Sequence, residues 1–256
     1  MNYKDWAEWY DIFYLSSEHE EENFYTAISK KVEGKILEIG VGTGRIAIRL
    51  AEIGKIVIGI DSSQEMIEKA KEKISAKNLS EKITLIISNM LSFNLNEKFD
   101  LIIIPANTLL LCNDEAEQTR VLINCQKHLT KNGKLIFNVY YPDNEMINEN
   151  NKEAFMFNTI DINDGGRYIL YSKNDFNINK QTNNSTQFIE KISIDGNVLF
   201  RKELKVKTRY LYPEDIIKLC ENSNLSVKKI SRDFLDLPVD QSADNIIVEA
   251  RKIKHL

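Results

Sequence analysis

The fold is decided by the stretch Ile36-Leu37-Glu38-Ile39-Gly40-Val41-Gly42-Thr43-Gly44-Arg45. A run of strand length, residues 35–39, leads into glycines at alternate positions, and a helical pattern of apolar residues follows over 45–53. Glycine lacks a Cβ, so backbone amides in such a turn can approach a ligand closely, and amides at a helix start favour an anionic group. The stretch therefore predicts a strand, a ligand-binding turn and a helix in direct succession.

The same alternation continues along the chain, which predicts an α/β fold with a parallel sheet. Ser62-Ser63-Gln64-Glu65 fits a capping box in which Ser62 covers the amide of Glu65 at the start of a second helix. Asn132-Gly133 is expected to separate a third helix from the fifth strand. The expected strands are 35–39, 55–60, 83–87, 101–104 and 134–139, and the expected helices are 45–53, 62–74 and 115–129.

Residues 155–211 follow a different pattern. They are rich in Tyr, Phe, Ile, Thr and Asn, and the turn pairs Asp164-Gly165 and Asp195-Gly196 interrupt them. These features predict antiparallel hairpins. A helix at 213–222 and two strands at 225–234 and 245–253 are expected to complete the chain.

The composition excludes several classes of protein. The 256 residues carry 34 Lys+Arg against 38 Asp+Glu, a net charge of -4, and 43% hydrophobic residues, enough to bury a full core. The apolar runs are far shorter than the roughly 18 residues of a membrane span, so no membrane association is expected. The slightly acidic balance gives no sign of a nucleic-acid partner, which would need clustered positive charge.

The cysteines and histidines favour a reduced, metal-free protein. Cys112, Cys125 and Cys220 lie far apart without a CxxC pair and are interpreted as buried thiols. The histidines do not fall at metal-ligand spacing near carboxylates, so no metal site is expected. The first residues show no export signal, and we expect a cytoplasmic protein.

The charged residues around the glycine turn restrict the class of ligand that it can bind. A nucleotide phosphate loop needs a lysine that does not follow this turn, and the dinucleotide pattern GxGxxG would place glycine where Arg45 stands. Glu38, two residues before the first glycine, would repel a pyrophosphate and attract an ammonium group. The turn therefore suits a zwitterion better than a pyrophosphate, although a dehydrogenase stays open as an alternative.

Asp61 is the second residue that points to a ligand. It follows the second strand, 21 residues after Gly40, where an acidic side chain meets ribose hydroxyls in such folds. A role as a helix cap is the alternative, and the two roles are compatible. A ligand with a ribose, a positive charge and no essential phosphate is indicated, and S-adenosylmethionine has all three properties.

Three motifs carry a resemblance to a known family: EIGVGTGR (38–45), IGIDSSQEM (58–66) and KFDLIIIPANTLL (98–110). They fall in order on successive strand ends, and on them the chain resembles the class I S-adenosylmethionine-dependent methyltransferases. The resemblance is to the small-molecule branch (methyltransferase domains of types 25 and 11) and covers nearly the whole chain. It implies a single domain over 1–256, a Rossmann-like three-layer sandwich with a mostly parallel seven-stranded sheet, and an antiparallel β insertion after the fifth strand.

The resemblance also implies site residues. The glycine turn would hold the methionine portion, Asp61 the ribose, and Asn89 would stand where the family commonly has Asp, still able to accept a hydrogen bond through its amide oxygen. The expected cofactor-binding residues are Tyr10, Tyr14, Glu38, Gly40, Gly42, Gly44, Arg45, Asp61, Ser62, Met66, Asn89, Met90, Pro105 and Ala106.

The N-terminal aromatic residues Trp6, Trp9, Tyr10, Phe13 and Tyr14 fall on one face of a helix. Such a stripe usually packs in a core. The resemblance implies instead that residues 1–30 form a helical lid over the cofactor, with its tyrosines near the methionine carboxylate or the acceptor.

The acceptor is expected near Asn107, Tyr140 and Tyr141. Methyl transfer is an in-line displacement that depends on positioning, so no residue stands out as a dedicated base, and the catalytic candidates are Tyr14, Asn107 and Tyr140. The insertion, residues 143–211, would set acceptor specificity or form a dimer face through Phe155, Phe157, Tyr168, Tyr171 and Tyr210.

The predicted function is methyl transfer from S-adenosylmethionine to nitrogen or oxygen of a small molecule. The alternatives are an RNA or protein methyltransferase and a non-catalytic S-adenosylmethionine-binding protein. The quaternary structure is expected to be a monomer or a homodimer.

Overall fold

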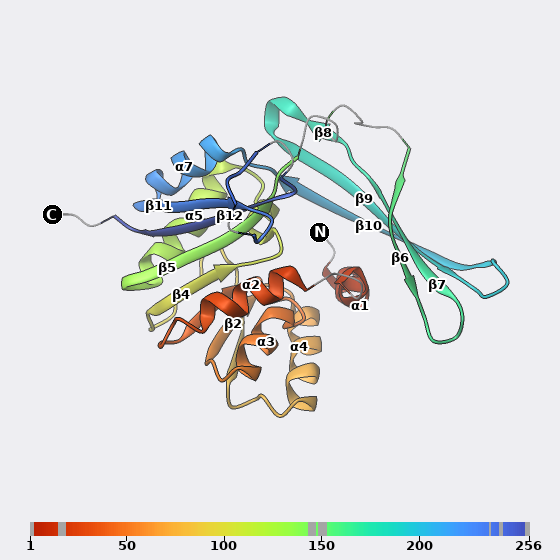
Figure 1. Ribbon diagram of the computed structural model, residues 1–256, viewed down its shortest axis with the longest axis horizontal. Helices are drawn as coiled ribbons and strands as arrows, with labels where there is room; N and C mark the ends of the chain where they lie inside the picture. Colours follow the sequence, from red (N-terminus) through yellow and green to blue (C-terminus); the bar gives the residue numbers. More distant parts are fainter. Residues whose placement is uncertain are drawn as a thin grey trace.

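Two β-sheets organise the chain in the computed structural model (Figure 1), which describes residues 3–14, 19–142, 147, 153–235, 237–240 and 243–253. The larger sheet has seven strands in the order β11-β12-β5-β4-β1-β2-β3, and the second has five, in the order β10-β9-β7-β6 with β8 paired on β9. The predicted α/β fold, with a mostly parallel seven-stranded sheet and an antiparallel insertion after the fifth strand, is confirmed.

The central sheet places several strand ends at one edge. β1 pairs in parallel with both β2 and β4, while β12 is antiparallel to its neighbours β5 and β11. The chain therefore leaves β1 toward one side and returns to it from the other, and ligands bind at such switch points in open α/β sheets. The strands are β1 (Ile36–Ile39), β2 (Val57–Asp61), β3 (Ile83–Ile87), β4 (Phe99–Ile104), β5 (Leu129–Tyr140), β11 (Leu225–Arg232) and β12 (Asn245–Lys252).

Helices cover both faces of this sheet because its inner strands are apolar on both sides. Leu37 and Ile102 belong to a core cluster shared with α5 and α7, whereas Ile36 and Leu101 belong to a cluster shared with α2, α3 and α4. This arrangement is the predicted three-layer sandwich. The helical elements are α2 (Glu20–Ser29), α3 (Arg45–Glu52), α4 (Gln64–Ala76), η1 (Thr108–Leu111), α5 (Glu115–His128) and α7 (Pro213–Asn222).

The second sheet is built from hairpins at the predicted turns. Gly165 (φ 79°) and Gly196 (φ 83°) have positive φ in the turns that join β6 to β7 and β9 to β10. The apolar part of this sheet packs against Trp6, Trp9 and Ile12 of helix α1. Its elements are β6 (Phe155–Asp161), β7 (Arg167–Lys173), β8 (Phe176–Asn177), η2 (Ile178–Lys180), β9 (Thr182–Ile192) and β10 (Val198–Arg209), and α1 spans Tyr3–Tyr14.

Two local predictions were wrong. Ser63, and not Ser62, caps helix α4: its Oγ accepts from the Met66 amide at 3.2 Å, because β2 continues through Asp61 and the helix begins later than expected. Strand β5 begins directly after α5 at Leu129, and Gly133 lies within it. A Cβ at Gly133 would come within 2.7 Å of the Phe99 carbonyl, so this glycine permits a close approach of two strands and does not end an element.

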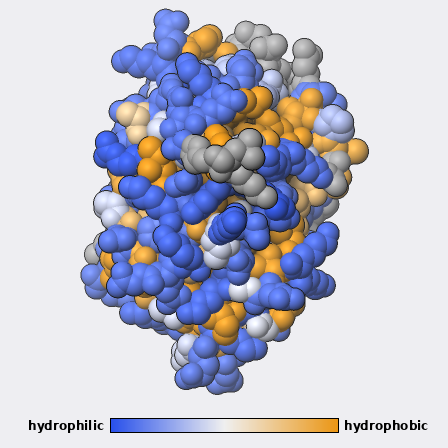
Figure 2. All heavy atoms as spheres, turned by 90° about the vertical axis from the view of Figure 1, so that its left-hand side faces the viewer, coloured by the Kyte–Doolittle hydropathy of each residue, from blue (hydrophilic) through white to orange (hydrophobic). Residues whose placement is uncertain are grey.

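The surface is mixed in character. Figure 2 shows a face on which hydrophilic residues predominate and hydrophobic ones form small groups between them, as on ordinary protein surfaces. Within the described ranges, none of the helices combines the length and apolar character needed to cross a membrane.

Candidate functional site

A cavity of about 880 Å³ opens at the edge where β1, β2 and β4 end, and it extends to the second sheet. The glycine turn after β1, the end of β2 and the loops after β3 and β4 line one part. Strands β7, β9 and β10 line the other, and helix α1 contributes Trp6 and Tyr10. The cavity thus lies between the two sheets.

The glycines of the turn have different tasks. Gly40 (φ 71°) and Gly42 (φ 53°) line the cavity, whereas Gly44 (φ 83°) is the residue before α3 and faces Ala70. A Cβ at Gly40 would lie 2.4 Å from Thr108, so this glycine lets the loop after β4 approach. A Cβ at Gly42 would meet no protein atom closer than 3.9 Å, so Gly42 leaves space open within the cavity.

Asp61 joins the glycine turn to the start of helix α4. Its Oδ2 accepts from the Gly42 amide and its Oδ1 from the Ser63 amide, both at 2.9 Å. Burial raises the pKa of the Asp61 carboxyl, and the hydrogen bonds from Ser63 and Gly42 oppose that rise. Asp61 also lines the cavity, so one carboxylate both fixes the turn and faces the ligand space.

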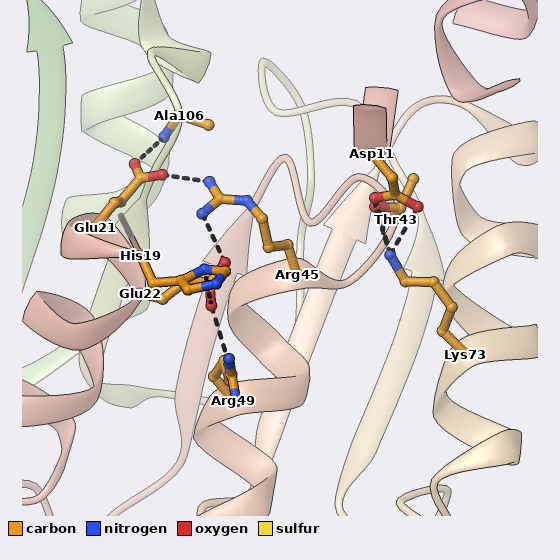
Figure 3. A network of polar contacts seen from close by, with 9 residues as sticks. All are labelled: Asp11, His19, Glu21, Glu22, Thr43, Arg45, Arg49, Lys73 and Ala106. Carbon is orange, nitrogen blue, oxygen red and sulfur yellow. Dashed lines mark hydrogen bonds and ion pairs between the residues drawn. The ribbon is translucent and has the colours of Figure 1, made fainter. Parts of the chain in front are cut away.

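Four predicted cofactor residues do not line the cavity: Gly44, described above, and Glu38, Arg45 and Pro105. Glu38 is 2% exposed, its Oε2 has no hydrogen-bond partner, and burial raises its pKa well above the usual value against the opposing charge of Arg45. Arg45 forms ion pairs with Glu21 and Glu22 of α2 (Figure 3). Pro105, the first residue of the loop after β4, is buried and is not among the lining residues.

The other predicted residues gather in the cavity, except one. The Tyr14 side chain lies outside the described part of the chain, so its predicted role is not tested. Asn89 accepts from the Leu91 amide at 2.8 Å, which shows that it shapes its own loop as well. The predicted residues that line the cavity are Tyr10, Gly40, Gly42, Asp61, Ser62, Met66, Asn89, Met90, Ala106, Asn107, Tyr140 and Tyr141.

The loop after β4 has an unusual backbone. Ala106 (φ 54°) and Asn107 (φ 61°) both adopt positive φ, and Glu21 of α2 accepts from the Ala106 amide at 2.7 Å. The same Glu21 carboxylate pairs with Arg45 (Figure 3). Helix α2 therefore holds the loop in place. The buried Asn107 Oδ1 beside the cavity has no hydrogen-bond partner within the described part of the chain.

A second polar network connects α1 to the glycine turn (Figure 3). Lys73 of α4 donates to both carboxylate oxygens of Asp11 at 3.0 Å, and Thr43 Oγ1 donates to Asp11 Oδ1 at 2.6 Å. Asp11, Lys73 and Glu21 were not predicted from the sequence. A salt bridge between residues 62 positions apart leaves no periodic signal, although the acidic run at 20–22 was a visible sign of a charged partner.

The aromatic residues of the insertion divide into two groups. Phe155 and Phe157 line the cavity, whereas Tyr168 packs edge-on against Trp9 and Tyr210 packs against Phe176 in the interior. The neighbouring polar residues of β7, β9 and β10, which the sequence analysis did not single out, supply more of the wall.

Tyr140 stands where the two parts of the cavity meet. Its hydroxyl forms a hydrogen bond of 2.9 Å with Thr208 Oγ1 of β10. Burial raises the pKa of Tyr140, with Thr208 and Asn183 opposing, so the phenol stays neutral and can donate or accept a hydrogen bond.

Residues 30–191 match the methyltransferase domain family, and the chain belongs to it. A protein of Geobacillus sp. (strain WCH70) named as a methyltransferase is 29% identical over 147 residues, which cover 55% of this chain and 58% of that relative. The chain thus spans less than two thirds of that relative's length. YqeM of Bacillus subtilis (strain 168), also named as a methyltransferase, is 22% identical and covers 99% of this chain and 98% of its own.

Solved structures show the same fold. An S-adenosylmethionine-dependent methyltransferase from Clostridium acetobutylicum superposes with a TM-score of 0.78 at 21% identity, over 98% of both chains. The sugar N-methyltransferase KedS8 from Streptoalloteichus has a TM-score of 0.71 at 16% identity, over 95% of this chain and 92% of its own. The chain thus has the fold of S-adenosylmethionine-dependent methyltransferases and belongs to the methyltransferase domain family, as its motifs predicted.

Proposed function

We propose that the chain transfers the methyl group of S-adenosylmethionine to a nitrogen or oxygen atom of a small molecule. The observation that carries this proposal is the single cavity that has the glycine turn and Asp61 at one end and a polar sheet face at the other. A donor and an acceptor can occupy these two ends and meet near Asn107 and Tyr140.

The donor end fits S-adenosylmethionine in shape and in charge. The space that a Cβ at Gly42 would enter lies beside Gly40, which suits the methionine portion. Asp61 offers a carboxylate to the ribose hydroxyls, and Met66, Asn89 and Met90 lie where an adenine would bind. Pro105, Glu38 and Arg45 would then act from behind this wall and not by contact.

The residues of the chain contribute mainly by positioning. The donor supplies an activated methyl group on a sulfonium whose leaving form is neutral, so little acid catalysis is needed. Asn107 and Tyr140 would orient the acceptor, while α1 and the second sheet exclude water from the space between. The lid role of residues 1–30 and the specificity role of residues 143–211 belong to this proposal.

A small acceptor is favoured over a macromolecule because α1 and the second sheet wall the cavity. The sugar N-methyltransferase with the same fold is an example of a protein that acts on a small acceptor.

The buried thiols fit a cytoplasmic protein. Burial raises the pKa of Cys112 and of Cys220 to about 12, so these unpaired thiols stay protonated.

Replacement of Asp61 tests the donor assignment. Asp61→Ala should weaken S-adenosylmethionine binding by about 10- to 100-fold in calorimetry, because hydrogen bonds to a charged group contribute about 1.5 to 3 kcal/mol. The matched control is Asp164→Ala in the β6–β7 turn. The Asp164 carboxylate also accepts a hydrogen bond from the amide two residues later in the chain, that of Gly166, at 2.9 Å. Equal affinities of both variants would contradict the ribose role.

Methyl transfer itself is tested with labelled donor and a metabolite extract, followed by mass spectrometry of the product. A labelled small molecule is the expected result. Tight donor binding without transfer to any metabolite would instead favour the non-catalytic alternative, and label on RNA or protein would favour the macromolecular one.

A further inference from the structure

A row of uncharged polar side chains crosses the inner face of the second sheet. Asn183, Ser185 and Gln187 alternate along β9 and therefore point to the same side. Ser172 of β7 lies opposite Gln187, and Thr208 of β10 lies opposite Asn183. We call these five residues the polar strip, and all five line the cavity.

The polar strip interrupts an apolar face. The next residue of β9 on this side, Ile189, is fully buried and packs with Leu170 and Leu204 against helix α1. Burying polar groups costs free energy unless they find hydrogen-bond partners. A face that served only packing would continue the apolar pattern, so the change of character beside the cavity indicates a ligand.

Most members of the polar strip are buried and held in place. Ser172, Asn183, Ser185 and Thr208 are between 5% and 9% exposed. Ser172 and Ser185 share a hydrogen bond of 3.2 Å, Thr208 binds Tyr140, and Asn183 donates to Asn174 at 3.1 Å. The strip is therefore a fixed set of hydroxyl and amide groups.

Among the residues that the structure describes, two buried amide oxygens in the cavity have no donor. They are Oε1 of Gln187 on the polar strip and Oδ1 of Asn107 on the loop after β4. An unpaired buried acceptor is unfavourable, and a hydroxyl or amine hydrogen of a ligand would satisfy it. The two oxygens therefore favour a ligand that has hydrogen-bond donors.

The charge of the cavity restricts the ligand further. In the part of the chain that the structure describes, the lining includes the carboxylates of Asp61, Glu117 and Asp244 but no lysine, arginine or histidine. Phosphates and carboxylates bind where cationic donors neutralise them. Away from the backbone amides of the glycine turn, an anionic acceptor would meet only carboxylates and uncharged groups.

We infer that the methyl acceptor is a hydroxylated small molecule, neutral or carrying an amine, without phosphate or carboxylate, and that it binds on the polar strip. The accepting nitrogen or oxygen would attack the methyl carbon with a lone pair while the bond from that carbon to sulfur breaks, and the proton of the acceptor would be released to solvent. This inference rests on the proposed function and adds the class of substrate to it. It predicts that free hydroxylated amines and alcohols are acceptors and that nucleotide-linked or phosphorylated forms of the same compounds are not.

Fractionation of the labelled products tests the class of acceptor. A metabolite extract is passed over an anion exchanger, and the retained and unretained pools are each incubated with the protein and labelled S-adenosylmethionine. The label should appear in the unretained pool. Label in the retained pool alone would overturn the inference but leave the proposed function standing, whereas no label in either pool would contradict the proposed function itself.

Variants of β9 test the place of binding. Gln187→Leu should lower the labelling rate of the unretained pool at least tenfold, while calorimetry gives a dissociation constant for S-adenosylmethionine within twofold of the original. The control is Thr186→Val on the same strand, whose side chain points to the opposite face; its rate should stay within twofold. A rate for Gln187→Leu equal to that of the control would overturn the assignment of the polar strip.

Discussion

The two ends of the cavity are encoded in different ways. The donor end comes from one short stretch, with Gly40, Gly42 and Asp61 following one another over two strand ends. The acceptor end comes from three strands of the second sheet, and its residues meet only through the register of β7, β9 and β10. A contiguous turn is readable in a sequence, whereas a surface assembled by strand pairing is visible only in the fold.

The largest effect is expected from a substitution that blocks donor binding and leaves the acceptor end unchanged. Gly42→Val puts a side chain into the open space of the cavity and should weaken S-adenosylmethionine binding by about 100-fold or more, measured by calorimetry. The control is Gly54→Val: Gly54 also has positive φ (91° against 53°), and nothing lies within 4 Å of its would-be Cβ.

Both glycine variants should lose stability to a similar degree, since a side chain at positive φ costs about 1 to 2 kcal/mol. Only Gly42→Val should lose the donor. Equal donor affinity in the two variants, at equal melting temperatures, would show that the cavity at Gly42 is not the donor site.

The predictions from sequence succeeded where a local rule decides the structure. The strand, glycine turn and helix at 36–52 and the hairpin glycines were predictable, because backbone geometry requires those residues there. Ser62 was predicted as the helix cap, whereas strand β2 continues to Asp61 because Asp61 pairs with Ile87 of β3, and this pairing has no local signature.

The remaining misses are cases in which tertiary contacts decide. Glu38 and Arg45 were expected at the ligand, but burial and the partners on α2 keep them behind the turn. The polar strip was not predicted because both alternate sets of positions at 183–187 are polar, so the sequence does not show which set shares the inner face of the hairpin. Whether these residues face solvent or a cavity depends on a sheet formed by distant segments.

The next largest effect is the pH dependence of stability that the buried carboxyl of Glu38, behind the donor end, should cause. Because the folded-state pKa of Glu38 is raised, the native state retains a proton that the unfolded chain has lost. The free energy of unfolding should therefore fall as pH rises above the unfolded value near 4.5. One group changes this free energy by at most about 1.4 kcal/mol per pH unit. Glu38→Gln should remove this fall.

Urea unfolding between pH 5 and pH 8 measures the difference. Glu52→Gln is the control: the hydrogen bond from Lys77 lowers the pKa of Glu52, so the contribution of Glu52 is lost only as pH falls below about 4.5 and stays constant over this range. If Glu38→Gln and the original chain lose stability in parallel as pH rises, Glu38 is ionised in the fold. Repeating the titration with saturating S-adenosylmethionine would show whether a bound cation permits ionisation.

The smallest effect concerns helix α1, the element that touches both ends of the cavity. Its Asp11 binds Lys73 and Thr43 beside the glycine turn, while its Trp9 packs on the second sheet. The side chains of Lys73 and Asp11 are 35% and 42% exposed, so their ion pair contributes less than about 1 kcal/mol. Lys73→Met should raise the KM for the donor by about two- to fivefold at low salt.

Lys77→Met is the matched control, since Lys77 lies one turn further along the chain and pairs with Glu52 at 2.7 Å, away from α1. The difference between the two variants should shrink in high salt, because ions screen exposed charges. If Lys73→Met raises KM for donor and acceptor together, α1 closes both ends as one unit. If it raises only the donor KM, the packing of Trp9 holds the acceptor side without help from the ion pair. Equal KM values for both variants at low salt would show that the contact of Asp11 with the glycine turn has no part in binding.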